Sequence, residues 1–154
     1  MAQRTSFICL LGTLAIIHST ALANGNLVSN SEFSALDGSG LPVLWSYGSG
    51  DYSFAHSNTE YPAGASQSLA ATVGSQSSSS QGYVQQQIYN IKPHHQYILA
   101  GWVYATVDNM AFLQFKRLNQ GSEINRVSSQ RNNGGWTYIE MTFDSLEANQ
   151  LMIL

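Results

Sequence analysis

The sequence predicts an all-β domain, a two-sheet antiparallel β-sandwich of the jelly-roll kind. After the first residues, no segment shows the apolar spacing of an amphipathic helix. Short runs of alternating apolar and polar residues recur instead, and clusters of Gly, Asn, Asp, Ser and Pro separate them. About ten short strands without helices are typical of two packed sheets.

The expected strands are spread over the whole chain after residue 25. They are 26–34, 44–47, 52–55, 67–73, 83–90, 97–106, 110–116, 123–129, 136–143 and 150–154. Turn residues stand between them at 37–40, 48–50, 75–80, 92–93, 119–121 and 132–135. The serine-rich stretch 75–80 is too short for an interdomain linker, so we expect a loop inside one domain.

The segment 1–23 is expected to be a secretory signal peptide that does not belong to the fold. Arg4 supplies a positive start, 7–17 is a short apolar run, and 21–23 (Ala-Leu-Ala) is a small-residue cleavage site. The apolar run is too short to span a membrane. Cleavage would leave 24–154 as one secreted domain, extracellular or periplasmic. Cys9 would leave with the leader, so we expect no disulfide.

Charge and composition favour a neutral polar partner. Without Arg4 the domain has 6 − 1 = 5 basic residues against 9 acidic ones, a net charge of −4, and no run of Lys or Arg. Nucleic acid is therefore not an expected partner. Three Trp and eight Tyr accompany many Ser, Gln and Asn residues. Aromatic rings and amides together suit the surfaces of polysaccharides.

The stretch "GYVQQQIYN" at 82–90 is unusual for a strand. Gln has low β-propensity, and an apolar core does not accept it without hydrogen-bond partners. Strand alternation turns Val84 and Ile88 inward, although Gln86 interrupts them. The opposite face then carries Tyr83, Gln85, Gln87 and Tyr89.

Two further strands show polar side chains on the face opposite to their core residues. In 110–116, Leu113 is expected to face the core and Gln114 to point outward. In 136–143, Ile139 points inward and Glu140 outward. A sheet face that is merely solvated would more usually carry Thr, Lys and Glu. We therefore expect these outward side chains to form a ligand face.

Several segments, in order, resemble secreted carbohydrate-binding modules of the family 4, 9, 16 and 22 group. "NLVSNSEFS" with "LWSYG" is similar to their opening, "YPAGASQSLAATV" to their Gly-x-x-Ser-Leu strand, "YVQQQIYNIKPHHQYILAGWVYA" to their strand, Pro turn and Tyr-x-x-x-x-Trp-Val segment, and "GGWTYIEMTF" to their Gly-Trp strand. The resemblance implies a jelly roll whose concave face binds a β-glycan chain, such as β-glucan or xylan. It places sugar-stacking aromatics at Tyr47 and Tyr83, and polar sugar contacts at Gln87, Gln114 and Glu140; alternation adds Gln85.

The sequence departs from this family at two places. Members often bind a structural calcium through an acidic residue just after the Phe of the first motif, but Ser34 follows Phe33 here, and Glu32 precedes it. The chain also stops at "NQLMIL", where the family continues through a strand that carries a second ligand, so we expect a C-terminally truncated member. Calcium needs about six oxygens or more. We therefore expect no cofactor; a structural calcium stays open, although two of its usual ligands are missing.

Catalysis is not expected. A glycoside hydrolase needs two facing carboxylates, and Glu140, mid-strand on the expected ligand face, has no evident partner. There is no Gly-x-Ser-x-Gly nucleophile motif. His94 and His95 follow Pro93 in a turn and have no third ligand at a familiar spacing, so we expect exposed turn histidines.

The tryptophans are expected to pack rather than to bind, because Trp is mostly buried on average. Trp45 is expected in the core, Trp136 as a plug after a Gly-Gly turn, and Trp102 with Tyr104 beneath a loop or a sheet edge. Two rival functions stay open. The same fold could make structural or adhesive protein–protein contacts, or it could be an accessory module severed from a glycoside hydrolase.

Overall fold

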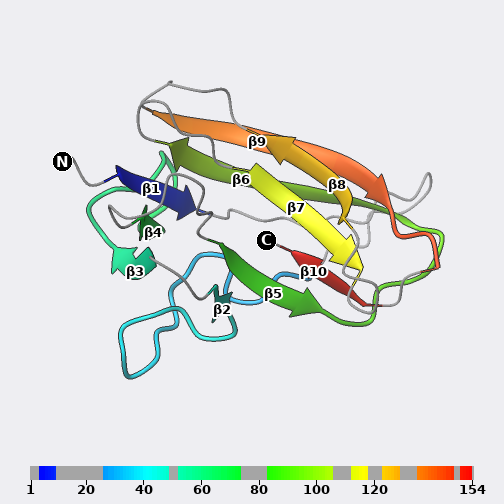
Figure 1. The fold of residues 1–154 in the computed structure, drawn as a ribbon, viewed down its shortest axis with the longest axis horizontal. Helices are drawn as coiled ribbons and strands as arrows, with labels where there is room; N and C mark the ends of the chain where they lie inside the picture. The colour runs from blue at the N-terminus through cyan, green and yellow to red at the C-terminus, as the bar shows by residue number, and fades with distance from the viewer. Residues whose placement is uncertain are drawn as a thin grey trace.

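The computed structural model describes residues 4–9, 26–48, 52–73, 83–105, 112–117, 123–128, 135–147 and 150–153. Every regular element in these ranges is a β-strand, and every pairing between the strands is antiparallel (Figure 1). The strands are β1 (Arg4–Cys9), β2 (Ser46–Tyr47), β3 (Tyr52–Ser57), β4 (Ser68–Val73), β5 (Val84–Ile88), β6 (Gln96–Ala105), β7 (Phe112–Arg117), β8 (Glu123–Ser128), β9 (Trp136–Asp144) and β10 (Leu151–Ile153). Within these ranges there is no helix of a length and apolarity that would cross a membrane.

The strands form two five-stranded sheets. The first sheet has the order β3-β4-β1-β6-β9, and the second has the order β2-β5-β10-β7-β8. In Figure 1, β10 lies between β5 and β7 in the second sheet. The all-β prediction is confirmed, with a sandwich-like arrangement of antiparallel sheets. The jelly-roll assignment stays a prediction.

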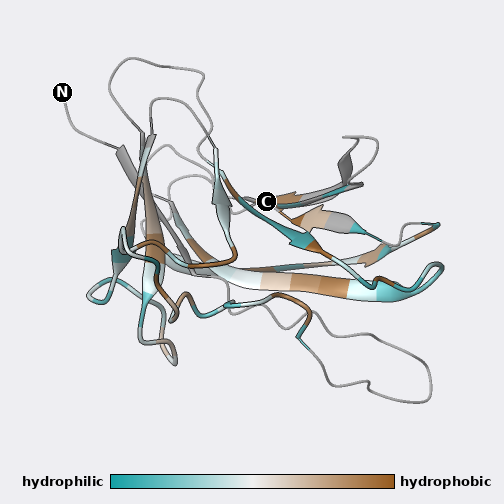
Figure 2. Ribbon diagram, turned by 90° about the horizontal axis from the view of Figure 1, so that it is seen from below, coloured by the Kyte–Doolittle hydropathy of each residue, from teal (hydrophilic) through white to brown (hydrophobic). Residues whose placement is uncertain are grey.

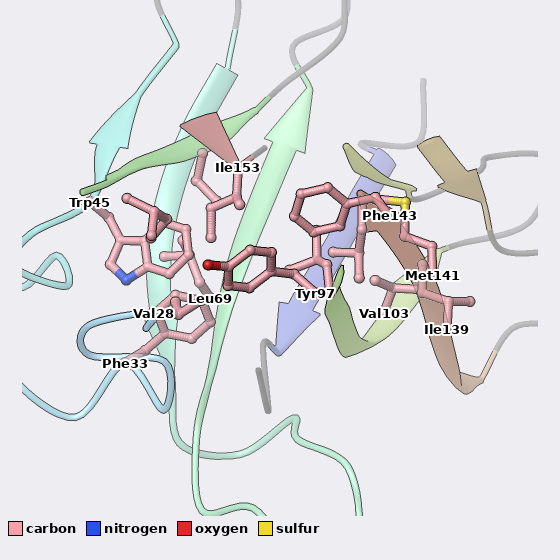
Figure 3. Close-up of a cluster of buried hydrophobic side chains, with 14 of the residues drawn as sticks. Val28, Phe33, Trp45, Leu69, Tyr97, Val103, Ile139, Met141, Phe143 and Ile153 are labelled. Atoms are coloured by element: carbon pink, nitrogen blue, oxygen red, sulfur yellow. The ribbon is translucent and has the colours of Figure 1, made fainter. Parts of the chain in front are cut away.

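Both sheets bury side chains in one hydrophobic core, which Figure 3 shows in part. The first sheet contributes Leu69 and Val103, and the second contributes Leu113 and Ile153; each of these is at most 1% exposed. In Figure 3, Tyr97 lies in the middle of the cluster, where it is fully buried. Because the core sides of both sheets meet in this cluster, the opposite sides of the sheets point away from each other.

Tyr97 and Trp45 show how polar groups in this core find partners. The Tyr97 ring stacks on Phe143 at a centroid distance of 5.7 Å, and its hydroxyl accepts a hydrogen bond from the Lys92 backbone N at 2.9 Å. Trp45 is 7% exposed, as expected for a core residue, and its Nε1 donates to the Asn30 carbonyl at 3.1 Å. A buried aromatic with a polar atom is stable only when that atom is hydrogen-bonded.

The strand expected at 26–34 does not form; the segment is a series of turns. Asn30 and Phe33 have positive φ angles of 48° and 55°, which a strand does not allow. Hydrogen bonds of the Asn30 side chain take the place of strand pairing in this segment. Nδ2 donates to the Ala35 and Val43 carbonyls, and Oδ1 accepts from Ala35 N. The strand was expected here because asparagine was not taken into account: its side chain competes with backbone pairing and tolerates the left-handed region.

The neighbouring strand is also shorter than expected. Leu44 has a φ of 70°, so β2 begins only at Ser46 rather than at residue 44. Before it, the predicted turn at 37–40 is present: Asp37 Oδ1 accepts hydrogen bonds from Ser39 N at 2.7 Å and from Leu41 N at 3.0 Å. Gly40 takes a φ of 77°, which glycine adopts without strain.

The predicted signal peptide contains a strand. β1 lies between β4 and β6 in the first sheet, antiparallel to both. Its register pairs Ile8 with Leu69 on one side and with Val103 on the other. That this segment is cleaved as a leader stays a prediction.

Candidate functional site

The three consecutive glutamines of β5 lie in three different environments. Gln85 is half-buried, Gln86 is buried and Gln87 is exposed. Val84 and Ile88, on the same face as Gln86, are 1% and 2% exposed. The alternation predicted from the sequence is therefore correct, and it leaves Gln86 on the core side. Figure 2 shows the hydrophilic run of β5 between its apolar ends.

Gln86 is a structural residue that joins β5 to the N-terminal loop. Its Oε1 accepts a hydrogen bond from Ser29 N at 2.8 Å, and its Nε2 donates to the Ser29 carbonyl at 2.8 Å and to the Leu44 carbonyl at 3.1 Å. These bonds use both amide hydrogens and the amide oxygen. A glutamine can thus replace an apolar residue at a core position, and the sequence alone gave no signal for its partners.

The side of the second sheet that points away from the core carries a group of polar side chains, here named the glutamine face. Strand register defines it, because directly paired residues share one side of a sheet. Gln87 pairs with Met152, and Met152 pairs in turn with Lys116. The other members of this face are Gln85, two residues before Gln87 on β5, and Gln114, two residues before Lys116 on β7.

Gln114 lies on this face, yet it is only 3% exposed. The prediction of its side is correct, since Leu113 beside it is in the core. The prediction that it would be exposed is wrong. β7 pairs on both sides, with β10 and with β8, and Gln114 makes a polar or ring contact of its own.

Tyr89 extends the glutamine face beyond the end of β5. It is 52% exposed, and its hydroxyl donates a hydrogen bond to Gln87 Oε1. The bond uses Oε1 of Gln87, so the Nε2 donors of the same amide point away from the tyrosine hydroxyl. Gln87 is itself exposed. Asn90, with a φ of 60°, then ends the extended backbone. An exposed ring and an exposed amide are thereby fixed next to each other.

Tyr83 lies at the other end of β5 and is half-buried. Its carbonyl accepts a hydrogen bond from Gly48 N at 3.0 Å, which continues the pairing between β2 and β5. Its ring lies against the α-carbon side of Gly48: a Cβ at position 48 would be 2.8 Å from Tyr83 Cε1. Tyr83 therefore has a defined ring position on this edge of the sheet.

Tyr47 does not lie on the glutamine face, contrary to the sequence prediction. It pairs with Val84, a core residue, and packs against the hydrophobic cluster. Its ring lies 5.0 Å from that of Phe54, and its hydroxyl donates to the Pro42 carbonyl at 2.9 Å. Burial, and secondarily the Asp37 charge, raises the pKa of Tyr47 from 10.0 to about 12. The motif suggested a stacking residue, but the register turns this ring inward.

Glu140 also lies elsewhere. It is on β9 of the first sheet, pairs with Ala100 and is exposed on the side away from the core. It therefore belongs to the opposite outer surface of the protein from the glutamines. Its neighbour on that side is Tyr138, 47% exposed, whose pKa is raised by burial first and then by the charge and hydrogen bond of Glu140.

Aromatic pairs occupy the outer side of the first sheet. Trp102 and Tyr138 are cross-strand partners whose ring centroids lie 5.5 Å apart, edge to face. Tyr104 and Trp136 form a second such pair at 5.8 Å. Trp102, Tyr104 and Trp136 are half-buried, because each pair covers its own rings. The sequence predicted Trp102 with Tyr104 beneath a loop or a sheet edge and Trp136 as a plug; the antiparallel register of β6 with β9 pairs these rings across the two strands instead.

The described ranges contain no group of three His, Cys, Asp or Glu side chains that could hold a metal ion. His94 and His95 lie in the predicted turn after Pro93, and His94 has a φ of 55° and is exposed. His95 Nδ1 lies 2.7 Å from the Pro93 carbonyl oxygen. Glu32 is exposed and Phe33 is fully buried.

Among the six predicted site residues, the structure thus brings Tyr83, Gln85, Gln87 and Gln114 to one side of the second sheet and separates Tyr47 and Glu140 from them. No model of a known protein family matches the chain, and no curated protein and no solved structure matches it either.

Proposed function

We propose that this protein is a secreted, non-catalytic carbohydrate-binding domain that binds a β-glucan or xylan chain along its glutamine face. The observation that supports the proposal most directly is the exposed Gln87–Tyr89 pair, which is held together by a hydrogen bond on the side of β5 away from the core. Gln87 is one of the polar sugar contacts that the resemblance to carbohydrate-binding modules implies; Tyr89 is not among the residues that it implies, and Tyr47 and Glu140, which are, lie elsewhere.

The chemistry of the pair suits a pyranose ring. A tyrosine ring offers an apolar surface to the C–H side of the sugar. The Gln87 amide nitrogen donates to hydroxyl oxygens while its oxygen is already used by Tyr89. Beside it in the paired row lies Met152, which adds a flexible apolar contact, followed by Lys116.

Binding of this kind neutralises no charge on the ligand. The polysaccharide is neutral, and the two central contacts, Gln87 and Tyr89, are neutral side chains. We therefore expect affinity that changes little with ionic strength. Exposed side chains must also be ordered on binding, which limits the affinity of a shallow site.

Affinity gel electrophoresis through soluble xylan, β-glucan and mannan tests the proposal. The test variant is Gln87→Ala/Tyr89→Ala, which removes the exposed pair. The matched control is Gln96→Ala/Tyr138→Ala, which removes one exposed glutamine and one exposed tyrosine from the outer side of the first sheet. We expect one polymer to slow the wild type and the control, and to leave the test variant unslowed.

Two other results would contradict this assignment. If no polymer slows the folded wild-type protein, glycan binding is not its function. If the control variant loses retardation and the test variant keeps it, the glycan binds the aromatic pairs of the first sheet instead. Circular dichroism of both variants establishes that each is folded before the gels are compared.

A second candidate, structural or adhesive protein contact, is favoured by one observation, the two aromatic pairs on the outer side of the first sheet. Aromatic residues are enriched at the cores of protein interfaces. A domain with this function should self-associate or bind a matrix protein through Tyr138. Sedimentation of the wild type and of Tyr138→Ser at increasing concentration distinguishes the two functions.

A further inference from the structure

β1 occupies the middle of the first sheet. It makes five residue pairs with β4, from Arg4↔Val73 to Ile8↔Leu69, and four with β6, from Ser6↔Ala105 to Cys9↔Trp102. β4 and β6 are therefore joined through β1. Yet β1 lies in the segment whose charge, apolar run and small-residue site predict a cleaved leader.

Removal of this strand would leave two facing strand edges. Neighbouring strands in a sheet are about 4.8 Å apart, so β4 and β6 would be separated by about 10 Å, the width of one missing strand. The backbone groups that pair with β1 on both edges would lose their partners, and unpaired buried backbone groups are costly. Core side chains beside the gap, Leu69 and Val103, are 1% and 0% exposed in the complete sheet.

The gap cannot close by simple pairing of its two edges. β4 and β6 are both antiparallel to β1 and hence parallel to each other. Direct contact would need a parallel ladder, with a different hydrogen-bond pattern, and a shift of about 5 Å across a closely packed core. All other pairings in the described ranges are antiparallel.

We propose that β4 and β6 form an acceptor slot for an extended polypeptide strand. In the uncleaved chain Arg4–Cys9 fills the slot. After cleavage the slot accepts a strand from another polypeptide, which pairs with both β4 and β6 by β-strand addition. This interaction would be independent of glycan binding, because the slot is in the first sheet and the glutamine face is on the second.

The sequence and pairing of β1 between β4 and β6 define the length, direction and residue type that a partner strand needs. The partner must supply about six residues in extended conformation, antiparallel to β4 and β6, without proline at the paired positions. An aliphatic residue is required where Ile8 stands, because both of its paired neighbours, Leu69 and Val103, face the core. Backbone hydrogen bonds then give affinity, and the aliphatic residue gives register.

A disulfide test first establishes that β1 is seated in the full chain. Protein is expressed without secretion, so that the leader is retained. Cys9 is the only cysteine, and Trp102 is its cross-strand partner. Trp102→Cys should therefore form an intramolecular disulfide on mild oxidation, because paired Cα atoms of antiparallel strands lie about 4.5–5.5 Å apart.

Tyr138→Cys is the matched control for this test. Tyr138 is paired with Trp102 on the far side from β1, so it lies about 10 Å from Cys9, beyond disulfide reach. We expect a disulfide in Trp102→Cys and none in Tyr138→Cys. Equal formation in both variants, or none in either, would show that β1 does not hold this register.

A peptide-exchange test then addresses the slot itself. The full chain carries a protease recognition sequence in place of residues 18–23, is folded, and is cut. A fluorescent peptide with the sequence of residues 3–10, Cys9 replaced by Ser, is added in excess. We expect uptake by the cut protein, no uptake by the uncut protein whose slot is filled, and no uptake of the same peptide with Ile8→Pro, which lacks a backbone donor.

Absence of uptake by cut protein that stays folded would overturn the proposal. Uptake by cut and uncut protein alike, or of both peptides alike, would overturn the proposal, because the binding would not require the slot. Should cutting unfold the protein, as measured by circular dichroism, recovery of the folded signal on adding the unmodified peptide supports the slot, and absence of recovery overturns it. A partner strand found in a second copy of this chain would appear as a concentration-dependent dimer of the cut protein.

Discussion

The ring of Tyr83 lies so close to Gly48 that a β-carbon at position 48 would be 2.8 Å from Tyr83 Cε1. Gly48 N also donates to the Tyr83 carbonyl at 3.0 Å, so the two residues are paired across the edge of the second sheet. An aromatic ring laid over an edge glycine compensates for the missing side chain. The orientation of Tyr83 at the edge of the glutamine face therefore depends on position 48.

We expect Gly48→Ala to destabilise the protein by about 1–3 kcal/mol, the usual cost of overpacking. Urea unfolding measures this cost. In the Tyr83→Ala background the same change should cost much less, because the ring that it meets is gone. Gly38→Ala is the control, since nothing lies within 4 Å of a Cβ there. An equal cost of Gly48→Ala in both backgrounds would show that the contact does not fix the ring.

Gln86 and Gln87 should behave oppositely when each is replaced. Gln86→Leu leaves the Ser29 and Leu44 backbone groups without their partner, and we expect a loss of about 1–3 kcal/mol in the free energy of unfolding. Gln87→Leu changes an exposed residue and should shift stability by less than about 0.5 kcal/mol. In affinity electrophoresis the larger effect should be that of Gln87→Leu, which should weaken the retardation of the protein by the glycan. A stable Gln86→Leu variant would contradict the structural role.

Tyr47 makes stability depend on pH in the alkaline range. Its pKa in the folded protein, about 12, exceeds the ordinary tyrosine value of 10.0. The neutral form is thus favoured by folding, and the stabilisation is complete below pH 10.0 and is lost as the pH rises toward 12. Absorbance of tyrosinate should show a component that titrates near pH 12 and is absent in Tyr47→Phe.

Asp37→Asn separates the two causes of this shift. Because burial is the larger cause, we expect the pKa of Tyr47 to fall only partly toward 10.0. Asparagine keeps the Oδ1 acceptor for Ser39 N and Leu41 N, so the turn is preserved. A return of the pKa fully to 10.0 would mean that the charge of Asp37, and not burial, dominates.

Glu140→Gln should leave glycan retardation unchanged, since Glu140 lies on the first sheet. The same variant should lower the pKa of Tyr138, because it removes the Glu140 charge that contributes to raising it. NMR titration of the Tyr138 ring measures the second effect. If Glu140→Gln abolishes retardation instead, the ligand binds the outer side of the first sheet.

Strand alternation predicted the faces of β5, β7 and β9 correctly, because side chains of an isolated strand alternate regardless of its neighbours. Alternation could not state which sheet a strand joins, and so Glu140 was grouped with the glutamines although β9 is in the other sheet. For Tyr47 the difficulty was register: only the pairing of Tyr47 with Val84 decides that its ring points inward.

Side-chain hydrogen bonding explains the other differences. The segment 26–34 was expected to be a strand, but Asn30 bonds the backbone of its own loop. Gln86 resembled its two neighbours in sequence, and only its bonds to Ser29, 57 residues earlier, mark it as structural. Contacts over such separations depend on the whole fold and are not visible in a local pattern.

The order in which the strands are synthesised differs from their order in the second sheet. β10, which follows β7, β8 and β9 in the chain, pairs with both β5 and β7 and lies at the centre of that sheet. Until the ribosome has released residues 151–153, β5 and β7 have no strand between them, and their open edges can pair with other chains. A nascent chain of this topology therefore keeps two open strand edges until its last strand is made, and such edges favour aggregation.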